Sequence, residues 1–188
     1  MAAVNILGLS GSLRAASCNS RLLRATARLA PRGVEVSIFG GLGALPLFNP
    51  DLEVSLPASV VAFHRAVARA DVLLFASPEY AHGVTGTIKN ALDWLVGFAP
   101  FATKFVAVLN ASPRARHADE ALREILRTMA AVIVEPASVS IPLLGACLDE
   151  SAIVATPALA GAIRACLRAL QEAVVSRRDS WPAESRGR

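Results

Sequence analysis

The chain has 188 residues, of which 54% are hydrophobic, and it carries a formal net charge of +4. This length and composition favour one globular domain with a substantial core over a disordered or fibrous protein. Most of the positive charge is arginine scattered along helical segments, where solvated polar faces explain it, and no aromatic-studded basic stripe accompanies it. We therefore expect no binding to nucleic acid.

Cysteine usage and the N-terminal sequence bear on metal binding and location. The three cysteines, at positions 18, 147 and 166, form no CxxC pair and are odd in number, which argues against a disulfide framework and against a zinc site. The N-terminus lacks a basic segment followed by a signal-peptide core, and no apolar run approaches the roughly twenty residues that span a bilayer. These features predict a cytoplasmic protein without a metal site and without a membrane partner.

Five apolar runs of strand length alternate with segments of helical periodicity. The predicted strands span residues 4–9, 34–39, 72–76, 105–110 and 132–139. The predicted helices are indicated around residues 22–29, 60–67, 88–95, 122–129 and 159–174. Because the strands are rich in Val, Ile and Leu without strict alternation, they indicate a parallel sheet covered on both faces. The expected fold class is a doubly wound α/β fold whose five-stranded sheet has the order 2-1-3-4-5.

The sequence predicts one domain over residues 1–175, since it contains no internal repeat and no convincing second domain. Pro136, Pro142 and Pro157 punctuate a long connection before the last helix. Residues 176–188 are polar and are expected to form a flexible C-terminal tail.

Three loops are predicted to surround one crevice. In doubly wound sheets, ligands bind beyond the carboxyl ends of the strands, where the connections switch direction. Residues 10–20 follow the first predicted strand, 77–86 the third and 111–117 the fourth, and these strands are neighbours in the expected order. The crevice is therefore the place to look for a ligand.

The first loop has the composition of an anion site. Around Gly11 it gathers hydroxyl, amide and guanidinium side chains, namely Ser10, Ser12, Arg14, Ser17, Asn19 and Ser20. Backbone N–H groups at the start of the following helix would bind a phosphate together with them. The P-loop, G-x-G-x-x-G and G-x-S-x-G patterns are not matched. An alternative interpretation stays open, in which Ser17 or Asn19 caps the helix and the other serines are turn residues.

The second loop has the composition of a wall for a flat aromatic ligand. Its residues 77–80, Ser-Pro-Glu-Tyr, come directly after the third predicted strand and are followed by Gly83 and Gly86. Proline supplies rigidity, and glycines permit close approach of the backbone. Tyr80 could stack on such a ligand or form a hydrogen bond with it. In the helix that follows, Trp94 is expected to lie in the core or at a subunit interface.

In these two loops the chain resembles the NADPH-dependent FMN reductase family of flavodoxin-like proteins, which also includes chromate, quinone and azo-dye reductases. The family signature G-S-L-R-x-x-S-x-N is present at residues 11–19. The signature P-E-Y-N-x-x-x-P-G-x-L-K-N-A-I-D-W is present with changes at residues 78–94. The resemblance covers most of the chain and implies a flavodoxin-like fold.

The resemblance also implies a set of cofactor-binding residues. The FMN phosphate would be held by Ser10, Ser12, Arg14, Ser17, Asn19 and Ser20. The isoalloxazine would be lined by Pro78, Glu79, Tyr80, Ala81, His82 and Gly83, with Ser112 contributed by the third loop. No residue is expected to be catalytic, because the cofactor carries the chemistry. His82 is interpreted as a surface loop residue, and His64 as a helix residue without a partner.

The chain departs from the family pattern in two loops. Ala81 replaces the usual Asn and Thr85 the usual Pro, so the polarity and stiffness of the second loop differ. The third loop, residues 111–117, lacks the glycines with which the family usually approaches the ring. Altered flavin affinity or access is therefore expected.

The function implied by the resemblance is an FMN-dependent NAD(P)H oxidoreductase. It would pass hydride from NADPH to bound FMN and then reduce a small-molecule acceptor such as a quinone, an azo compound, chromate or free flavin. Arg114 and Arg116 are candidates for contacting the 2′-phosphate of NADPH. The family also implies a homodimer or homotetramer.

Two alternative functions stay open. One is a flavin-binding electron carrier or redox-sensing partner protein without enzymatic activity, because the same fold and phosphate loop support that use. The other is a scaffold without flavin that acts through protein contacts, which the altered third loop favours.

Overall fold

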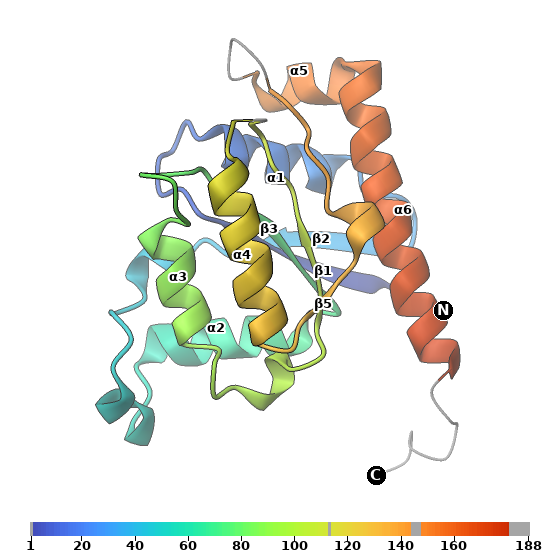
Figure 1. The fold of residues 1–188 in the computed structure, drawn as a ribbon. Helices are drawn as coiled ribbons and strands as arrows, with labels where there is room; N and C mark the ends of the chain where they lie inside the picture. The colour runs from blue at the N-terminus through green and yellow to red at the C-terminus, as the bar shows by residue number, and fades with distance from the viewer. Residues whose placement is uncertain (1, 113, 144–147, 181–188) are drawn as a thin grey trace.

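Five parallel strands form one sheet in the order β2-β1-β3-β4-β5, in a computed structural model that describes residues 2–112, 114–143 and 148–180 (Figure 1). The strands are β1 (Val4–Ser10), β2 (Val34–Ile38), β3 (Val72–Ala76), β4 (Phe105–Val108) and β5 (Val132–Ile133). All four neighbouring pairs are parallel. The predicted flavodoxin-like topology is therefore confirmed.

Helices connect the strands and follow the last of them. They are α1 (Cys18–Arg28), α2 (Ala58–Arg69), α3 (Gly86–Asp93), α4 (Arg116–Thr128), α5 (Glu150–Ala155) and α6 (Pro157–Ser180). Sequence periodicity predicted all of them except α5, a short helix that begins where the Asp149 carboxylate accepts the backbone N–H of Ala152 at 2.8 Å. Among the described helices, none is both long enough and apolar enough to cross a bilayer.

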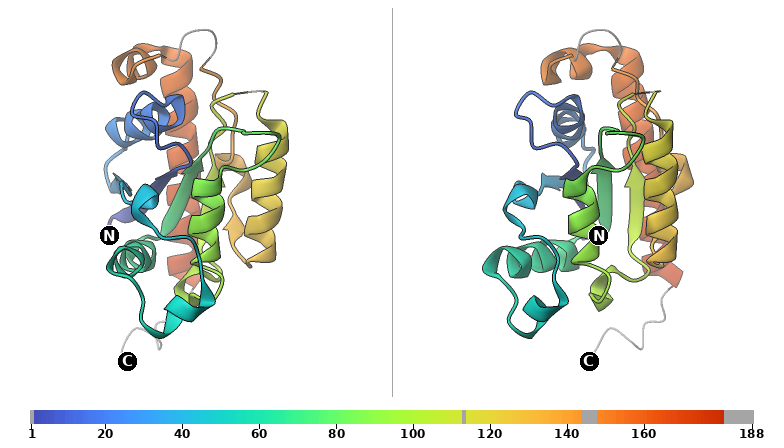
Figure 2. Two further views of the ribbon diagram at one scale, coloured as in Figure 1. Left: turned by 90° about the vertical axis from the view of Figure 1, so that its left-hand side faces the viewer. Right: turned by 60° about the vertical axis from the view of Figure 1, so that its left-hand side comes forward.

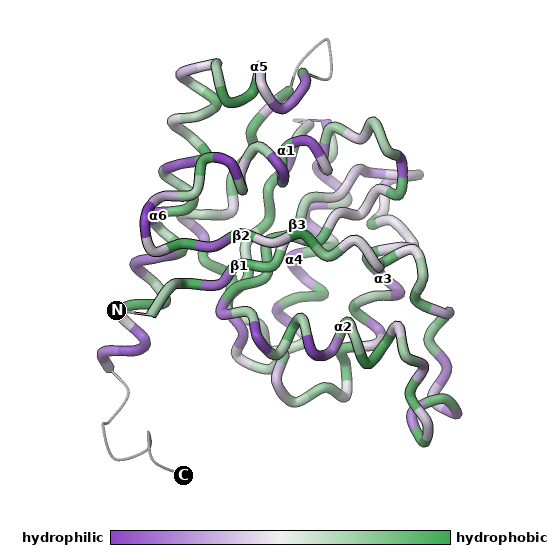
Figure 3. The backbone as a smooth tube through the Cα atoms, turned by 180° about the vertical axis from the view of Figure 1, so that it is seen from behind, coloured by the Kyte–Doolittle hydropathy of each residue, from purple (hydrophilic) through white to green (hydrophobic). Residues whose placement is uncertain are grey.

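Helices cover both faces of the sheet (Figure 2). The buried side chains form one core layer on each face. Side chains alternate between the faces along each strand. In β1, Ile6 faces the layer formed with α1, α5 and α6, whereas Leu7 faces the layer formed with α2, α3 and α4. All five residues of β3 are buried, and all five are hydrophobic, as the colouring of this strand shows (Figure 3). This two-sided burial explains why the strands lack an alternating sequence pattern.

The last strand is shorter than predicted. Only Val132 and Ile133 pair with β4, whereas the sequence predicted a strand over residues 132–139. Residues Glu135–Ala137 form a 3-10 turn instead, because Pro136 has no backbone N–H for a sheet ladder. The chain returns to the sheet edge farther on, where an isolated bridge joins Asn110 to Ser140.

The last helix extends beyond its predicted end. Residues 176–180 were expected to belong to the tail but are the final residues of α6. Two arginines hold this end of the helix, since Arg177 donates to the carbonyl of Thr103 at 2.7 Å and Arg178 forms an ion pair with Asp71 at 2.9 Å. The predicted tail at 181–188 lies outside the described residues.

Two side chains, Asn90 on α3 and Trp94 directly after it, hold the irregular segment that follows β2. The Asn90 amide accepts from the backbone N–H of Phe48 at 2.8 Å and donates to the carbonyl of Pro46 at 2.9 Å. The indole N–H of Trp94 donates to the same carbonyl at 2.8 Å, and its ring packs edge-on against Phe48. Trp94 is only 3% exposed, so it is a core residue, one of the two roles predicted for it.

His64 has two partners, so the expectation that it has none is wrong. Its Nε2 lies 2.7 Å from the carbonyl oxygen of Trp94, and its ring stacks on Phe98 with 4.0 Å between ring centroids. Both partners follow α3 in the chain and pack against α2. This contact between residues 30 positions or more apart is not visible in local periodicity.

Asn90→Ala tests the role of α3 in holding this segment. The change removes the acceptor for Phe48 and one donor to Pro46, so we expect the free energy of unfolding to fall by about 1–3 kcal/mol. Urea denaturation followed by circular dichroism measures this loss. The control is Asn49→Ala, which removes an exposed cap of a 3-10 turn and should cost less than about 1 kcal/mol. Equal stability of Asn90→Ala and the parent protein would contradict this role.

Candidate functional site

The loops after β1 and β3 touch each other at the carboxyl edge of the sheet. The backbone N–H of Gly11 donates to the carbonyl of Ala76 at 2.9 Å. A Cβ atom added to Gly11 would lie 2.1 Å from Ser77 Oγ and 2.6 Å from Ser77 Cβ. Such distances are far inside van der Waals contact, so only a glycine at position 11 permits this approach. The two loops singled out in the sequence therefore lie side by side.

Two neighbouring pockets open at this edge. The larger has a volume of about 600 Å³ and is lined by residues from all three predicted loops, from the start of α1 and from the segment after β5. The smaller, of about 390 Å³, lies between the first loop, the start of α1 and the second loop. Cys18, Asn19 and Pro78 line both pockets. Cys18 is disulfide-bonded, contrary to the expectation from the number and spacing of the cysteines. We refer to the two pockets together as the cleft.

The structure brings most of the predicted cofactor-binding residues to the cleft. Those that line it are Ser12, Arg14, Ser17, Asn19, Pro78, Glu79, Tyr80 and Ser112. Those that are not among its lining residues are Ser10, Ser20, Ala81, His82 and Gly83. Sequence reasoning missed several lining residues, namely Ala16, Cys18, Arg21, Ser77, Ala111, Ala115 and Leu143. Ser77 and Ala111 could have been found from their place at or just beyond the carboxyl ends of the third and fourth predicted strands.

Hydrogen bonds within the first loop hold its hydroxyl groups. Ser10 Oγ and Ser20 Oγ lie 2.7 Å apart, and Ser10 Oγ also accepts from the backbone N–H of Ser12 at 3.3 Å. Ser17 is the N-cap of α1, and its Oγ accepts from the backbone N–H of Ser20 at 3.4 Å. The capping role considered for Ser17 is therefore correct. Ser10 and Ser20 bind each other within the loop and are not among the lining residues of the cleft.

Asn19 carries an unpaired polar atom. Its side chain is buried, with 7% of the residue exposed, and its Oδ1 has no hydrogen-bond partner among the described residues. A buried acceptor without a partner costs about 1–3 kcal/mol. Because Asn19 lines both pockets, a donor on a ligand in the cleft would remove this cost.

The charges around the cleft favour an anion. Arg14 and Arg21 line the smaller pocket, and Arg114 lines the larger one. Among the described residues that line the two pockets, Glu79 is the only acidic one. The first turn of α1 adds the positive end of a helix dipole. The donors present therefore fit a ligand with a phosphate group.

The second loop makes a tight turn with an unusual backbone. Tyr80 and Gly83 exchange backbone hydrogen bonds of 3.2 and 3.0 Å, and the two residues between them are Ala81 and His82. Their φ angles are 49° and 59°, which lie in the left-handed region. Turns of this kind favour Asn-Gly at the two central positions. Ala81 stands where the family usually has Asn. Alanine adopts the left-handed region less readily than asparagine does.

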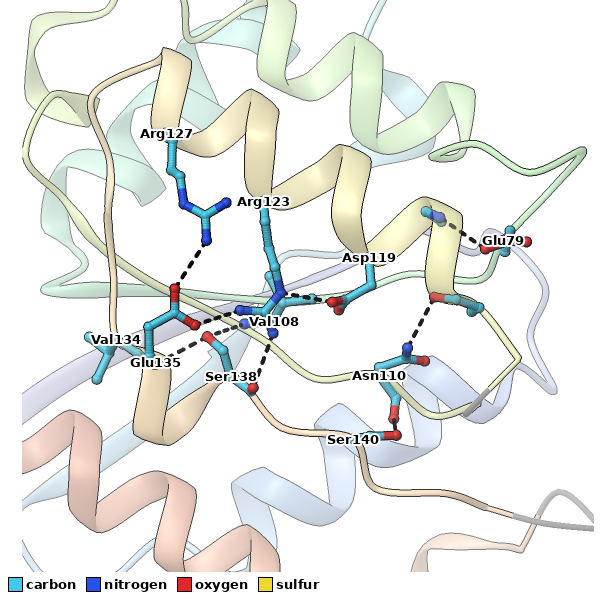
Figure 4. A network of polar contacts seen from close by, with 12 residues as sticks. Glu79, Val108, Asn110, Asp119, Arg123, Arg127, Val134, Glu135, Ser138 and Ser140 are labelled. Carbon is cyan, nitrogen blue, oxygen red and sulfur yellow. Dashed lines mark hydrogen bonds and ion pairs between the residues drawn. The ribbon is translucent and has the colours of Figure 1, made fainter.

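The second loop is also tied to α4. The residue before α4 is Ala115, which has no side chain to cap the helix. Glu79 Oε2 supplies the missing acceptor by accepting from the backbone N–H of Ala118 at 2.9 Å (Figure 4). A carboxylate at a helix N-terminus is favourable. Nearby, the ring of His82 stacks on that of His117 with 4.4 Å between centroids.

Asn110 organises the third loop in place of glycines. Its side-chain oxygen accepts from the backbone N–H of Ser112 at 2.9 Å. Its amide donates to the carbonyl of Ala115 at 3.1 Å (Figure 4). Its backbone carbonyl accepts from the N–H of Ile141 at 2.8 Å. The third loop is therefore attached both to α4 and to the segment after β5.

An arginine network holds that segment against α4. Arg123 Nε donates to Asp119 at 2.7 Å, its Nη1 to Glu135 at 2.8 Å and its Nη2 to the carbonyl of Ser138 at 3.0 Å (Figure 4). The Arg123 side chain is 17% exposed. Because three partners surround one largely buried guanidinium, this network fixes the segment that leads to Leu143, which lines the larger pocket.

The comparison with known proteins agrees with this geometry. The family profile of NADPH-dependent FMN reductases matches residues 4–144, so the chain belongs to this family. Within the described residues, the match includes all five strands and all three loops of the cleft.

The chain is also similar to individual relatives and to a solved structure. The chain is 38% identical over 112 residues to an NAD(P)H-dependent FMN reductase of Pseudomonas aeruginosa, covering 58% of this chain and 60% of the relative. It is 38% identical over 117 residues to a probable NADPH:quinone oxidoreductase of Oryza sativa, covering 58% of this chain and 57% of the relative. The matches thus span less than two thirds of these relatives. The solved structure is that of FerB, a flavoenzyme NAD(P)H:(acceptor) oxidoreductase from Paracoccus denitrificans. It superposes on this chain with a TM-score of 0.70 at 25% identity, covering 90% of this chain and 98% of FerB.

Gly11→Ala tests the contact between the first two loops. The added methyl group would collide with Ser77, so we expect the free energy of unfolding to fall by about 1–3 kcal/mol. Replacing Ser77 by Gly in the same chain removes the two closest colliding atoms, leaves Ile88 Cγ1 at 2.9 Å, and should restore part of the loss. Urea denaturation of the single and double variants measures both effects.

Gly161→Ala is the matched control for this substitution. Gly161 lies in α6, where an added methyl group meets open space, and alanine favours a helix over glycine by about 1 kcal/mol. This variant should therefore be slightly more stable than the parent protein. A Gly11→Ala variant as stable as Gly161→Ala would contradict the close contact.

Proposed function

We propose that the protein is an FMN-dependent NAD(P)H oxidoreductase, which passes hydride from NADPH through bound FMN to a small acceptor such as a quinone, an azo compound, chromate or free flavin. The observation that carries the proposal is the contact between Gly11 and Ser77, which joins the two family motifs at one cleft. Membership of the NADPH-dependent FMN reductase family supports it. So do the names of the bacterial and plant relatives.

The phosphate end of FMN would lie at the first loop and the start of α1. Ser12 and Ser17 each accept a backbone N–H through Oγ and retain a hydroxyl proton to donate. Arg14 is exposed beside the smaller pocket and provides a forked cationic donor. Asn19 offers its unpaired Oδ1 to a hydroxyl of the ligand.

The ring end would lie at the second and third loops. Pro78, Ala111 and Leu143 supply apolar surface in the larger pocket and exclude water there. Glu79 acts by positioning, because its carboxylate already holds the first turn of α4. When bound, FMN supplies the redox chemistry, accepting hydride from a nicotinamide and delivering electrons to an acceptor. This scheme requires no acid–base residue of the protein.

Arg14→Ala should weaken FMN binding without unfolding the protein. A charge-assisted hydrogen bond is worth about 1.5–3 kcal/mol, so the dissociation constant should rise by about 10- to 100-fold. Fluorescence titration of flavin-free protein measures this change, and a urea unfolding curve verifies the fold. The control is Arg65→Ala, an exposed arginine on α2 away from the cleft. Unchanged flavin content after Arg14→Ala would falsify the phosphate assignment.

Steady-state kinetics separates an enzyme from an electron carrier. An enzyme oxidises NADPH continuously in the presence of a small quinone, whereas a carrier needs a separate protein reductase before it is reduced. A colourless protein that does not take up FMN would favour a scaffold instead.

Arg114 is the stronger candidate for the 2′-phosphate of NADPH. It lines the larger pocket, whereas Arg116, the first residue of α4, is not among the lining residues of the cleft. Arg114→Ala should raise KM for NADPH by about tenfold or more and change KM for NADH much less, since NADH has no 2′-phosphate. Arg116→Ala is the matched control and should leave both values close to those of the parent. Equal losses with both nucleotides would argue against this role.

We also propose a cytoplasmic homodimer or homotetramer. Trp94 itself is covered by the segment after β2 and is not free to contact a second subunit. Large apolar side chains nearby are exposed, with Leu47 at 83%, Val54 at 94% and Val96 at 68%. Exposed apolar surface of this kind marks protein interfaces.

A further inference from the structure

A second polar pocket lies at the opposite edge of the sheet from the cleft. Its volume is about 300 Å³, and it is bounded by the residues just before β3 and β4, the end of α2 and the last turns of α6. The end of α6 lies beside the residues before β1 (Figure 1), because Arg178 donates to the carbonyls of Ala2 and Ala3 at 3.0 and 3.3 Å. We call this second pocket the basic pocket, because the charged residues in the described part of its lining are Arg69, Lys104, Arg177 and Arg178 with a single carboxylate, Asp71.

The carboxylate in the basic pocket is already engaged. Asp71 accepts from Arg178 Nη2 with both oxygens at 2.9 Å, and its Oδ2 also accepts from the backbone N–H of Asn5 at 2.8 Å. Arg178 and Asp71 therefore neutralise each other. The positive charges of Arg69, Lys104 and Arg177 have no comparable counter-charge in the lining.

Two of these cations are held in place and partly buried. Lys104 Nζ donates to the carbonyl of Ala70 at 2.7 Å, and the Arg177 guanidinium lies 3.4 Å above the centre of the Phe105 ring. Burial lowers the pKa of Lys104, Asp71 partly opposes this effect, and the positive charge of Arg177 lowers the pKa further. An anion between the two side chains would offset both the burial and the repulsion.

We infer that the basic pocket binds a tetrahedral oxyanion, either inorganic phosphate or the phosphate group of a small phosphomonoester. A lysine and an arginine side by side match such a dianion, since the lysine supplies a point charge and the arginine a forked set of donors. The Lys104 ammonium uses one of its donors on Ala70, and the other two are available to a ligand. This site goes beyond the proposed redox function, because it lies at the amino ends of the strands.

The chain offers an internal control for a test, because Lys104 and Lys89 are its only lysines. Lys89 lies on α3 and pairs with Asp93, outside the basic pocket. The protein is treated with an amine-reactive acetylating reagent, and acetylation at each lysine is followed by mass spectrometry. Parallel samples contain inorganic phosphate, glycerol phosphate or sodium chloride at equal ionic strength. Each is run with and without saturating FMN.

Phosphate or glycerol phosphate should protect Lys104 selectively. A bound anion slows acetylation in proportion to the occupied fraction, so near-saturating ligand should slow it at least about fivefold at Lys104 and leave Lys89 unchanged. The more protective of the two compounds identifies the source of the phosphate group. Protection by chloride to the same extent, or no selective protection of Lys104, overturns the inference.

Arg177→Gln provides a second measurement. Glutamine can still donate to the carbonyl of Thr103 but carries no charge, so the phosphate concentration for half-protection of Lys104 should rise about tenfold. Arg168→Gln, an exposed position on α6 outside the pocket, is the matched control. FMN affinity should be the same in both variants. An unchanged half-protection concentration in Arg177→Gln would refute the site, whatever the result for flavin.

Discussion

The close approach of Gly11 to Ser77 is the constraint on which the candidate site depends. β1 and β3 are neighbours in the sheet, and the chain leaves both strands at the same edge. A side chain at position 11 would force the two loops apart at the point where the cleft begins. The positions of the hydroxyl groups, of Asn19 and of Pro78 all follow from this contact. The parallel sheet thus determines where a ligand can bind, and one missing side chain allows the cleft to form there.

Most of the fold could be predicted because its signals are local. Apolar runs bounded by turn residues marked all five strands, and apolar spacing marked every long helix. The errors came from competing local chemistry. Pro136 ended a strand that hydrophobicity alone would have extended, and Asp149 started a short helix within a proline-rich connection. The end of α6 was misplaced because polar residues there suggested a tail, whereas Arg177 and Arg178 bind to distant parts of the chain.

The candidate site was predicted less completely, because its geometry depends on contacts between distant residues. Glu79 was expected beside the ring, yet its carboxylate caps a helix that starts 37 residues later in the chain. The loss of glycines in the third loop indicated altered access, and the compensating bonds of Asn110 could not be read from its neighbours in sequence. The two motifs identified the correct loops, while residues from α1, from the third loop and from the segment after β5 complete the walls.

The turn at Ala81 and His82 lies next to Tyr80, a lining residue of the cleft, and its backbone conformation is strained. Left-handed geometry at a residue other than Gly, Asn or Asp is unfavourable by about 1–2 kcal/mol, and here two such residues are adjacent. Neighbouring contacts hold them, chiefly the His82–His117 stack and the Glu79 bond to α4. The turn keeps this conformation only while those contacts hold it. The backbone next to Tyr80, at the edge of the smaller pocket, therefore depends on the position of α4.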